Sequence, residues 1–294
     1  MEDRPLPTVA ITGAGGQVGR ALLERLQGAR VAPVAITRTA ARLPVEEHVV
    51  GSLYSAPAQA ALGRADYIVH LAGTLRPIGN NSYRAANLET AEAVARAVRG
   101  GRARRLLMLS FVGAAVDSPD EYLRTKALAE RVLVATGKEV VVFRCGHIIG
   151  SPDAPGPTAA AFLAGGGNAV LVFGSGRQLV ARVYLGDVAT ALVAALRRGP
   201  PGVYDLVGPD RMTMDELERL VNGERDIRIR HLPSWLARSL GRLVPSLPSA
   251  LVDVMLRDSL GDGSAARAAF GICPTSLKTI WREPADRPAQ PVGA

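Results

Sequence analysis

A tyrosine and a lysine stand four places apart in the stretch SPDEYLRTKALAE, as Tyr122 and Lys126. On an α-helix this spacing puts both side chains on one face. A free tyrosine has a pKa of ~10 and is a poor proton donor or acceptor at neutral pH, but a nearby ammonium group favours the phenolate and lowers that pKa. The pair is therefore either proton-transfer chemistry or two solvated residues on a helix surface, and the preceding sequence must decide between these interpretations.

Three glycines near the beginning of the chain, Gly13, Gly16 and Gly19, lie between an apolar run and a helix-like segment. In such a loop the first glycine permits a tight turn, the second lets the backbone approach a pyrophosphate, and the third lets helix and strand pack closely. The helix beginning near Gln17 and Val18 would offer free backbone N–H groups and its positive dipole end to the phosphates. This spacing in this context predicts a dinucleotide site.

The segment AITRTAAR ends the next apolar run and should contact the adenosine ribose. It contains Arg38 and Arg42, and no carboxylate occurs before Glu46. An acidic residue there would bind the 2′-hydroxyl of NAD, whereas a guanidinium can bind the 2′-phosphate of NADP. We therefore expect NADP(H) to be preferred over NAD(H), with Arg38 as a cofactor-binding residue; the alternative is an ordinary surface arginine.

Short apolar runs alternate with helix-like stretches through the first half of the chain. The expected strands are 6–12, 31–37, 46–50, 65–73, 103–110 and 138–144. The expected helices are 16–27, 57–62, 82–99 and 120–136. Continuous apolar runs bounded by helices are typical of a parallel sheet covered on both faces. We therefore expect an α/β fold, a Rossmann-type doubly wound parallel sheet with a smaller C-terminal substrate lobe.

The alternation loosens after Gly150, where the turn cluster SPDAPGP follows. We expect a dinucleotide-binding Rossmann domain over residues 1–150. A substrate-binding lobe, interwoven with that domain, would span 151–281 and include GVYDLVG as another strand. The proline-rich polar end, 282–294, is expected to be disordered.

The bulk composition excludes several classes of protein. The net charge of +8 comes from arginines spread along the chain, so we expect no nucleic-acid partner, although a mild positive field would favour an anionic cofactor. No unbroken run of about 18 apolar residues occurs, so we expect no membrane span. The two cysteines and four histidines are scattered, which predicts neither a disulfide framework nor a metal site and favours a cytoplasmic location.

Several motifs now stand in order at fitting distances: TGAGGQVG, HLAG, Asn87 in AANLET, Ser110 and YLRTK. Together they resemble the short-chain dehydrogenase/reductase superfamily, in its extended and atypical, epimerase-like branch. The likeness covers roughly residues 7 to 281. It implies a Rossmann domain with a small C-terminal substrate lobe, and it favours chemistry over a solvated helix face for the pair at 122 and 126.

The resemblance also implies a role for each matching residue. Tyr122 would donate or accept the proton, Lys126 would bind the nicotinamide ribose and lower the tyrosine pKa, and Ser110 would orient the substrate carbonyl. Asn87 would support the helix behind them. The implied cofactor-binding residues are Gly13, Gly16, Gln17, Val18, Gly19, Arg38, Ala72, Gly73 and Lys126, and no metal site is implied.

The chain also departs from the family pattern. Family members often have two serines at the end of the fifth strand, but here the second place holds Phe111, and only twelve positions separate Ser110 from Tyr122. If the second place is the working one, the serine role is lost. His70 and His147 are interpreted as packing or framework residues rather than as acids.

We expect an NADPH-dependent ketoreductase that acts on a small hydrophobic, polycyclic or natural-product-like molecule, as in secondary metabolism. The segments 150–180 and 232–260 are rich in Leu, Val, Pro and Gly and poor in acids, which favours an apolar substrate. One alternative is a nucleotide-sugar epimerase or dehydratase. Another is a non-catalytic NADP-binding sensor or assembly protein. Both a monomer and a homodimer are compatible with the sequence.

Overall fold

The computed structural model describes residues 6–77, 79, 81–156, 168–223, 225–244 and 247–281. The end of the chain at 282–294, expected to be disordered, lies outside these residues. Within the described ranges, no helix is both long enough and apolar enough to cross a membrane.

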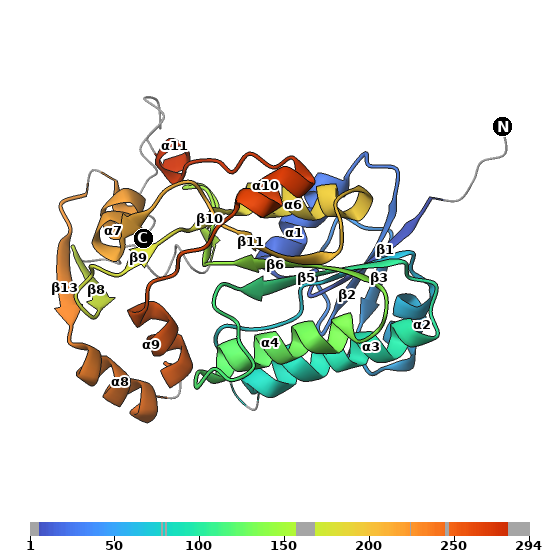
Figure 1. Cartoon of the computed structure of the whole chain (residues 1–294), viewed down its shortest axis with the longest axis horizontal. Coiled ribbons are helices and arrows are strands. Elements are labelled where there is room, and N and C mark those ends of the chain that lie inside the picture. Colours follow the sequence, from blue (N-terminus) through green and yellow to red (C-terminus); the bar gives the residue numbers. More distant parts are fainter. Residues whose placement is uncertain are drawn as a thin grey trace.

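A seven-stranded parallel sheet forms the centre of the molecule, with the strand order β11-β6-β5-β4-β1-β2-β3 (Figure 1). The strands are β1 (Thr8–Thr12), β2 (Ala32–Thr37), β3 (Glu47–Val50), β4 (Tyr67–His70), β5 (Arg105–Phe111), β6 (Glu139–Cys145) and β11 (Gly202–Leu206). The six strands expected in the first half are confirmed, as is the Rossmann-type parallel sheet. The strand order reverses between β1 and β4: β2 and β3 extend the sheet from β1 in one direction, and β5, β6 and β11 extend it from β4 in the other. Such a reversal point is where folds of this kind bind dinucleotides.

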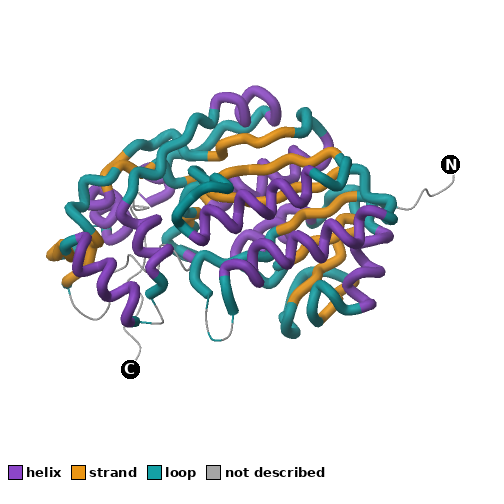
Figure 2. Tube along the Cα trace, turned by 60° about the horizontal axis from the view of Figure 1, so that its bottom comes forward, coloured by secondary structure: helices purple, strands orange, loops and turns teal. Residues whose placement is uncertain are grey.

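Helices cover both faces of this sheet (Figures 1 and 2). One face carries α2 (Ala56–Arg64), α3 (Thr90–Arg99) and α4 (Glu121–Val134), and the other carries α1 (Gln17–Leu26), α6 (Leu185–Arg197) and α10 (Ser264–Phe270). Successive strand residues point to opposite faces, so Leu106 packs in the core beneath α2, α3 and α4 while Leu107 packs in the core beneath α1 and α6. This explains why the strands are apolar throughout.

The helix that carries Tyr122 and Lys126, α4, begins where its sequence predicts. The side chain of Asp120 caps α4 by accepting a hydrogen bond from the Leu123 N–H at 3.0 Å. The preceding helical segment is continuous from η1 (Arg84–Glu89), a π-helical stretch, into α3. The irregular stretch carries Asn87 and sits beside α4.

The smaller lobe lies at the end of the sheet where the parallel strands finish (Figure 1). Its elements are β7 (Ile148–Ile149), β8 (Ala169–Phe173), β9 (Leu179–Val180), β10 (Val183–Tyr184), β12 (Met212–Thr213), α7 (Met214–Asn222), β13 (Arg228–Leu232), α8 (Ser234–Leu243), α9 (Ser249–Leu256) and α11 (Leu277–Trp281). Three small two-stranded sheets, β10-β7, β12-β9 and β13-β8, hold it together. After residue 150 the chain returns to the Rossmann layers, where α6 packs against α1 and β11 pairs with β6. The expected domain boundaries stay a prediction.

Candidate active site

A cavity of about 640 Å³ lies between the carboxyl ends of the sheet strands and the lobe. The Rossmann side contributes the start of α1, the segment after β4, the ends of β5 and β6, and the first turns of α4. The lobe contributes β8, α7 and α9. The residues that the sequence predicts to be catalytic, Ser110, Tyr122 and Lys126, all border this one cavity.

The glycine loop after β1 forms a close-packed cradle at one end of the cavity. Gly13 has φ +69°, and a Cβ there would lie 2.8 Å from the Ala72 backbone nitrogen. A Cβ on Gly19 would lie 2.6 Å from the Ala14 Cα. Gly16 is the N-cap of α1 and has no side chain to occupy the free N–H groups of that helix. This cradle fits the pyrophosphate of a dinucleotide, which would face the first residues of α1.

The nicotinamide side of the expected site is built around Gly73. A Cβ at this residue would lie 2.8 Å from Asn87 Oδ1 and 3.6 Å from Lys126 Nζ. Asn87 Oδ1 accepts a hydrogen bond from the Thr74 N–H at 3.0 Å, and Asn87 Nδ2 donates to Thr125 Oγ1 at 3.2 Å. Asn87 therefore ties the loop after β4 to α4, the helix that carries the tyrosine and lysine.

Arg38 follows β2 directly and is exposed. Its guanidinium forms no hydrogen bond or ion pair with the part of the chain that the structure describes. A Cβ on Gly15 of the glycine loop would lie 3.5 Å from Thr37 Cγ2, so the loop and the end of β2 are neighbours. Arg38 thus stands beside the cradle with its charge unengaged, the position expected for a contact with the adenosine ribose.

Tyr122 and Lys126 are held in different ways. Lys126 Nζ donates a hydrogen bond to the Leu109 carbonyl oxygen at 2.6 Å. The Tyr122 ring packs between Tyr83, at a centroid distance of 5.7 Å, and Phe111, at 5.4 Å. Backbone therefore positions the lysine, and aromatic packing positions the tyrosine.

Burial governs the protonation of both groups. It raises the pKa of Tyr122, with smaller contributions from Tyr83, Cys145 and Asp120. Desolvation of the phenolate is the main cause, and Lys126 is not among the groups that shift this pKa. The lowering expected from the lysine together with an oxidised nicotinamide stays a prediction. Burial also lowers the pKa of Lys126 to about 8, against the opposing effect of Glu130. At neutral pH the phenol is protonated and the lysine is mostly charged.

Ser110 and Phe111 both border the cavity at the end of β5. The hydroxyl oxygen of Ser110 is enclosed and has no hydrogen-bond partner among the described residues. Phe111, which stands where a second serine is common, contacts the rings of Tyr122 and His147 edge-on, the latter at 5.3 Å and 88°. It forms an apolar wall and supplies no hydrogen bond.

His70 and His147, both expected to be packing or framework residues, differ in the structure. His70 Nδ1 is hydrogen-bonded to Thr12 Oγ1 at 2.8 Å, and burial lowers its pKa to about 3, which suits a neutral framework residue. His147 borders the cavity, and both of its ring nitrogens lack a partner in the described structure. Its immediate neighbours, Gly146 and Ile148, have no polar side chain, so the local sequence did not indicate that His147 borders a cavity.

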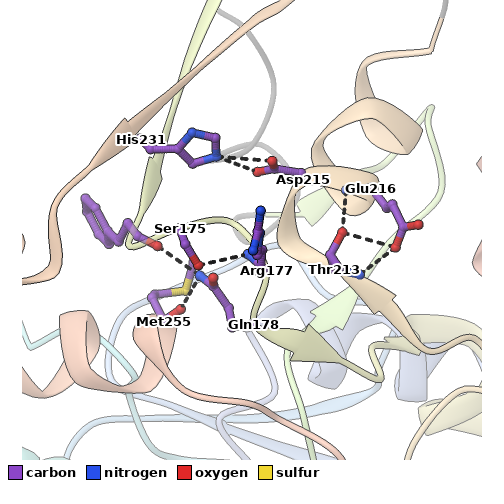
Figure 3. Close-up of polar contacts among 9 residues, drawn as sticks. Ser175, Arg177, Gln178, Thr213, Asp215, Glu216, His231 and Met255 are labelled. Atoms are coloured by element: carbon purple, nitrogen blue, oxygen red, sulfur yellow. Dashed lines mark hydrogen bonds and ion pairs between the residues drawn. The ribbon is translucent and has the colours of Figure 1, made fainter.

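Two polar residues at the lobe end were missed entirely. Gln178 Nε2 donates to the carbonyl oxygens of Phe173 at 2.9 Å and Met255 at 3.0 Å, which joins the end of β8 to α9 (Figure 3). Glu218 of α7 also borders the cavity and is buried. The signal for Glu218 was available, because it falls among the apolar positions of the helix TMDELERLV. In the described ranges, no group of three or more His, Cys, Asp or Glu side chains could hold a metal ion.

The match to a known protein family decides the assignment of this fold. The NAD dependent epimerase/dehydratase family matches residues 9–206. The chain belongs to this family. This match confirms the resemblance to the extended, epimerase-like branch that the sequence motifs indicated. The glycine cradle also fits NAD, the nicotinamide dinucleotide named in the family's description.

Two similar proteins show how far the likeness extends. NADH dehydrogenase (ubiquinone) 1 alpha subcomplex subunit 9, mitochondrial, of Arabidopsis thaliana is 32% identical over 167 residues, which cover 55% of this chain and 41% of that protein. Ceramide reductase of Caulobacter vibrioides is 29% identical over 222 residues, 72% of this chain and 68% of that protein. The matched stretch is thus less than half the length of the plant relative.

A solved structure agrees with this fold along nearly the whole chain. The Bordetella bronchiseptica enzyme WbmH, in complex with NAD+, superposes with a TM-score of 0.71 at 20% identity, covering 94% of this chain and 96% of WbmH. At this identity the likeness establishes the fold, including the C-terminal lobe, and leaves the substrate open.

Proposed function

We propose that the protein is an NADPH-dependent reductase that transfers a hydride to the carbonyl group of a small, largely apolar molecule. The observation that carries the proposal is one cavity in which a protonated tyrosine and a lysine lie between a glycine cradle and an apolar lobe. The similarity to a protein named ceramide reductase is consistent with reduction.

The bound dihydronicotinamide would supply the hydride, which forms the new C–H bond at the carbonyl carbon. The carbonyl oxygen gains the electron pair and takes the phenolic proton of Tyr122. The ammonium group of Lys126 stabilises the phenolate that remains until water reprotonates it. Ser110 Oγ, which lacks another partner, would donate a hydrogen bond that strengthens as the oxygen gains charge.

The lobe side of the cavity favours an apolar substrate over a nucleotide sugar. Its lining includes Leu171, Phe173, Leu247, Leu251 and Met255. A diphosphate group would need cationic or N–H donors in the lobe. These five side chains cannot provide them, and the Nε2 group of Gln178, which also borders the cavity, already donates to the carbonyl oxygens of Phe173 and Met255. The epimerase alternative therefore receives less support than the reductase.

Arg38 supports NADPH as the reductant. Its unengaged guanidinium at the end of β2 could bind the 2′-phosphate, and the segment that follows offers no carboxylate for the 2′-hydroxyl of NADH before Glu46. The choice between the two cofactors rests on this residue.

The proposal is tested by mixing the purified protein with NADPH and a panel of aliphatic and cyclic ketones while the absorbance of NADPH is followed. We expect one or more ketones to be reduced, and the same ketones to be reduced far more slowly by the Tyr122→Phe variant. UDP-sugars serve as the comparison panel. Conversion of a UDP-sugar without reduction of any ketone would contradict the proposal and favour an epimerase, and NADPH binding without any turnover would favour a sensor.

A further inference from the structure

Glu218 is a buried carboxyl group at the lobe end of the cavity. It lies on the inward face of α7 with Met214, Leu217 and Val221, and only 2% of the residue is exposed. Met214 and Glu218 both border the cavity. A carboxyl group on the apolar face of a helix is unfavourable unless something hydrogen-bonds it.

The other two carboxylates of α7 have hydrogen-bond or ion-pair partners, whereas one carboxyl oxygen of Glu218 has no hydrogen-bond partner in the described part of the chain. Asp215 is paired with His231 Nε2 at 2.9 Å, and Glu216 accepts the Thr213 N–H at 2.7 Å in a capping box (Figure 3). The Oε2 atom of Glu218 is enclosed and makes no hydrogen bond with any described residue. The capping and pairing of its neighbours therefore leave Glu218 as the polar group that this helix presents to a ligand.

Arg182 is a buried cation whose charge acts on Glu218, but no hydrogen bond or ion pair joins the two side chains among the described residues. It lies on the connection between β9 and β10 and is 2% exposed. Its Nη2 donates to Met214 Sδ at 3.3 Å, while Nε and Nη1 have no partner in the described ranges. Met214 and Glu218 line the cavity, whereas Arg182 does not. A ligand in the cavity would therefore contact Glu218 directly and would interact with Arg182 only through its charge.

We propose that Glu218 determines substrate specificity by hydrogen-bonding a hydroxyl group at the end of the substrate remote from the reacting carbonyl. This inference rests on the proposed reductase function. The substrate class is therefore an apolar ketone that carries a distal hydroxyl, with its carbonyl end at Tyr122 and its hydroxyl end at α7.

A hydroxyl fits this environment better than an amine or a carboxylate. The pKa of Glu218 is raised to about 8, mainly by burial and to a smaller extent by Asp215, with Arg182 opposing the rise, so the carboxyl is mostly neutral at neutral pH. A neutral carboxyl group can donate one hydrogen bond and accept another, and a hydroxyl can complete both. A cationic amine would be repelled by Arg182, and a carboxylate has only acceptors, so it would leave the accepting oxygen of the neutral carboxyl without a donor.

The test uses product analogues that bind without reacting. Secondary alcohols of graded chain length, ending in a methyl, a hydroxyl or a carboxylate, are titrated calorimetrically into the protein with NADPH present. The protein variants are Glu218→Gln, which keeps hydrogen bonding, and Glu218→Met, which removes it. Glu216→Gln is the control, because it makes the same chemical change on the same helix and a glutamine retains the capping box. The melting temperature of each variant reports its folding.

We expect the terminal hydroxyl to tighten binding about tenfold in the unmodified protein, in Glu218→Gln and in Glu216→Gln, as one good hydrogen bond should. The gain should vanish in Glu218→Met, which should bind the methyl-ended series at least as tightly. If Glu218→Met does not fold, the preference among the three series in the unmodified protein decides.

Equal binding of methyl- and hydroxyl-ended alcohols, a gain that persists in folded Glu218→Met, a preference for the carboxylate, or no binding of any series would each overturn the inference. A hydroxyl preference together with no reduction of the matching ketones would uphold the role of Glu218 in binding and overturn only the proposed reductase function.

Discussion

At the scale of single residues, the protonated state of Tyr122 suits a proton donor. Burial raises its pKa, and Lys126 is held by the Leu109 carbonyl oxygen, so the structure prepares a neutral phenol beside a cation. This arrangement fits the reductive direction, in which the protein must give up a proton. The same burial makes the phenol a weak acid, and the charge that develops on the substrate oxygen must help to draw the proton across.

Arg38→Ala should weaken NADPH binding by at least tenfold and leave NADH binding nearly unchanged. Loss of one charge-assisted phosphate contact costs about 1.5–3 kcal/mol. Dissociation constants for both cofactors, measured by fluorescence titration, check this expectation, and Arg42→Ala is the neighbouring control. Equal affinity of the unmodified protein for NADPH and NADH would contradict the assignment of Arg38.

Ser110→Ala should lower kcat by about 100-fold with little change in KM, because its hydroxyl would act mainly in the transition state. The serine is enclosed and borders the cavity, so its melting temperature should be measured beside kcat. A near-normal kcat would mean that Tyr122 and Lys126 work without a serine.

Glu218 should make the protein less stable as the pH rises from 4.5 to about 8. The pKa of its carboxyl is raised from 4.5 to about 8, so across this window the folded state keeps a proton that the unfolded state releases. Stability from this group is complete below 4.5 and is lost as the pH rises through the folded value. Glutamine does not titrate, so the free energy of unfolding of Glu218→Gln, relative to that of the unmodified protein, should rise as the pH increases from 4.5 to about 8. A difference between the two proteins that does not change with pH would contradict the raised pKa.

At the scale of elements, Arg105 joins β5 to the end of α6. Its guanidinium donates to the carbonyl oxygens of Ala195 at 2.8 Å, Arg198 at 2.9 Å and Gly199 at 2.7 Å. A cation at a helix C-terminus also complements the helix dipole. These contacts hold an element from after residue 150 against the Rossmann sheet.

Arg105→Met should therefore lower the free energy of unfolding by at least about 2 kcal/mol, since it leaves these buried carbonyl groups without a donor. The exposed neighbour Arg104, whose guanidinium lies over the Tyr67 ring, is the matched control, and Arg104→Met should cost about 1 kcal/mol or less. Urea unfolding of both variants checks this, and equal losses would contradict the capping role of Arg105.

The central strands were predictable because each is a continuous apolar run. Strand 103–110, for example, is observed as Arg105–Phe111, and strand 138–144 as Glu139–Cys145. The glycine loop was predictable because its turn and its close backbone contacts leave no room for a Cβ at Gly13 or Gly19. The π-helical stretch around Asn87 was not, because the apolar pattern of 82–99 is also satisfied by a regular helix.

At the scale of the whole molecule, the site exists because the chain returns to the sheet after residue 150. Strand β11 adds to the edge of the sheet beside β6, and α6 packs against α1, so the lobe between these returns is held over the strand ends. The strands of the lobe are as short as two residues, and their pairing depends on contacts far apart in the sequence. That is why the assembled cavity wall, including the place of His147 in it, could not be predicted from local patterns, whereas the buried position of Glu218 was indicated by the apolar pattern of its own helix.

The central claim is that Tyr122 gives a proton to a carbonyl group in this cavity. The most direct test is kcat of Tyr122→Phe with a ketone that the unmodified protein reduces, measured with the dissociation constant for NADPH. Phenylalanine keeps the ring contacts with Tyr83 and Phe111, so the fold and cofactor binding should be retained. We predict that kcat falls by about 10²–10⁴-fold, the usual contribution of a general acid, while NADPH binds as before. Retention of most of the activity would contradict the account and place the proton donor elsewhere.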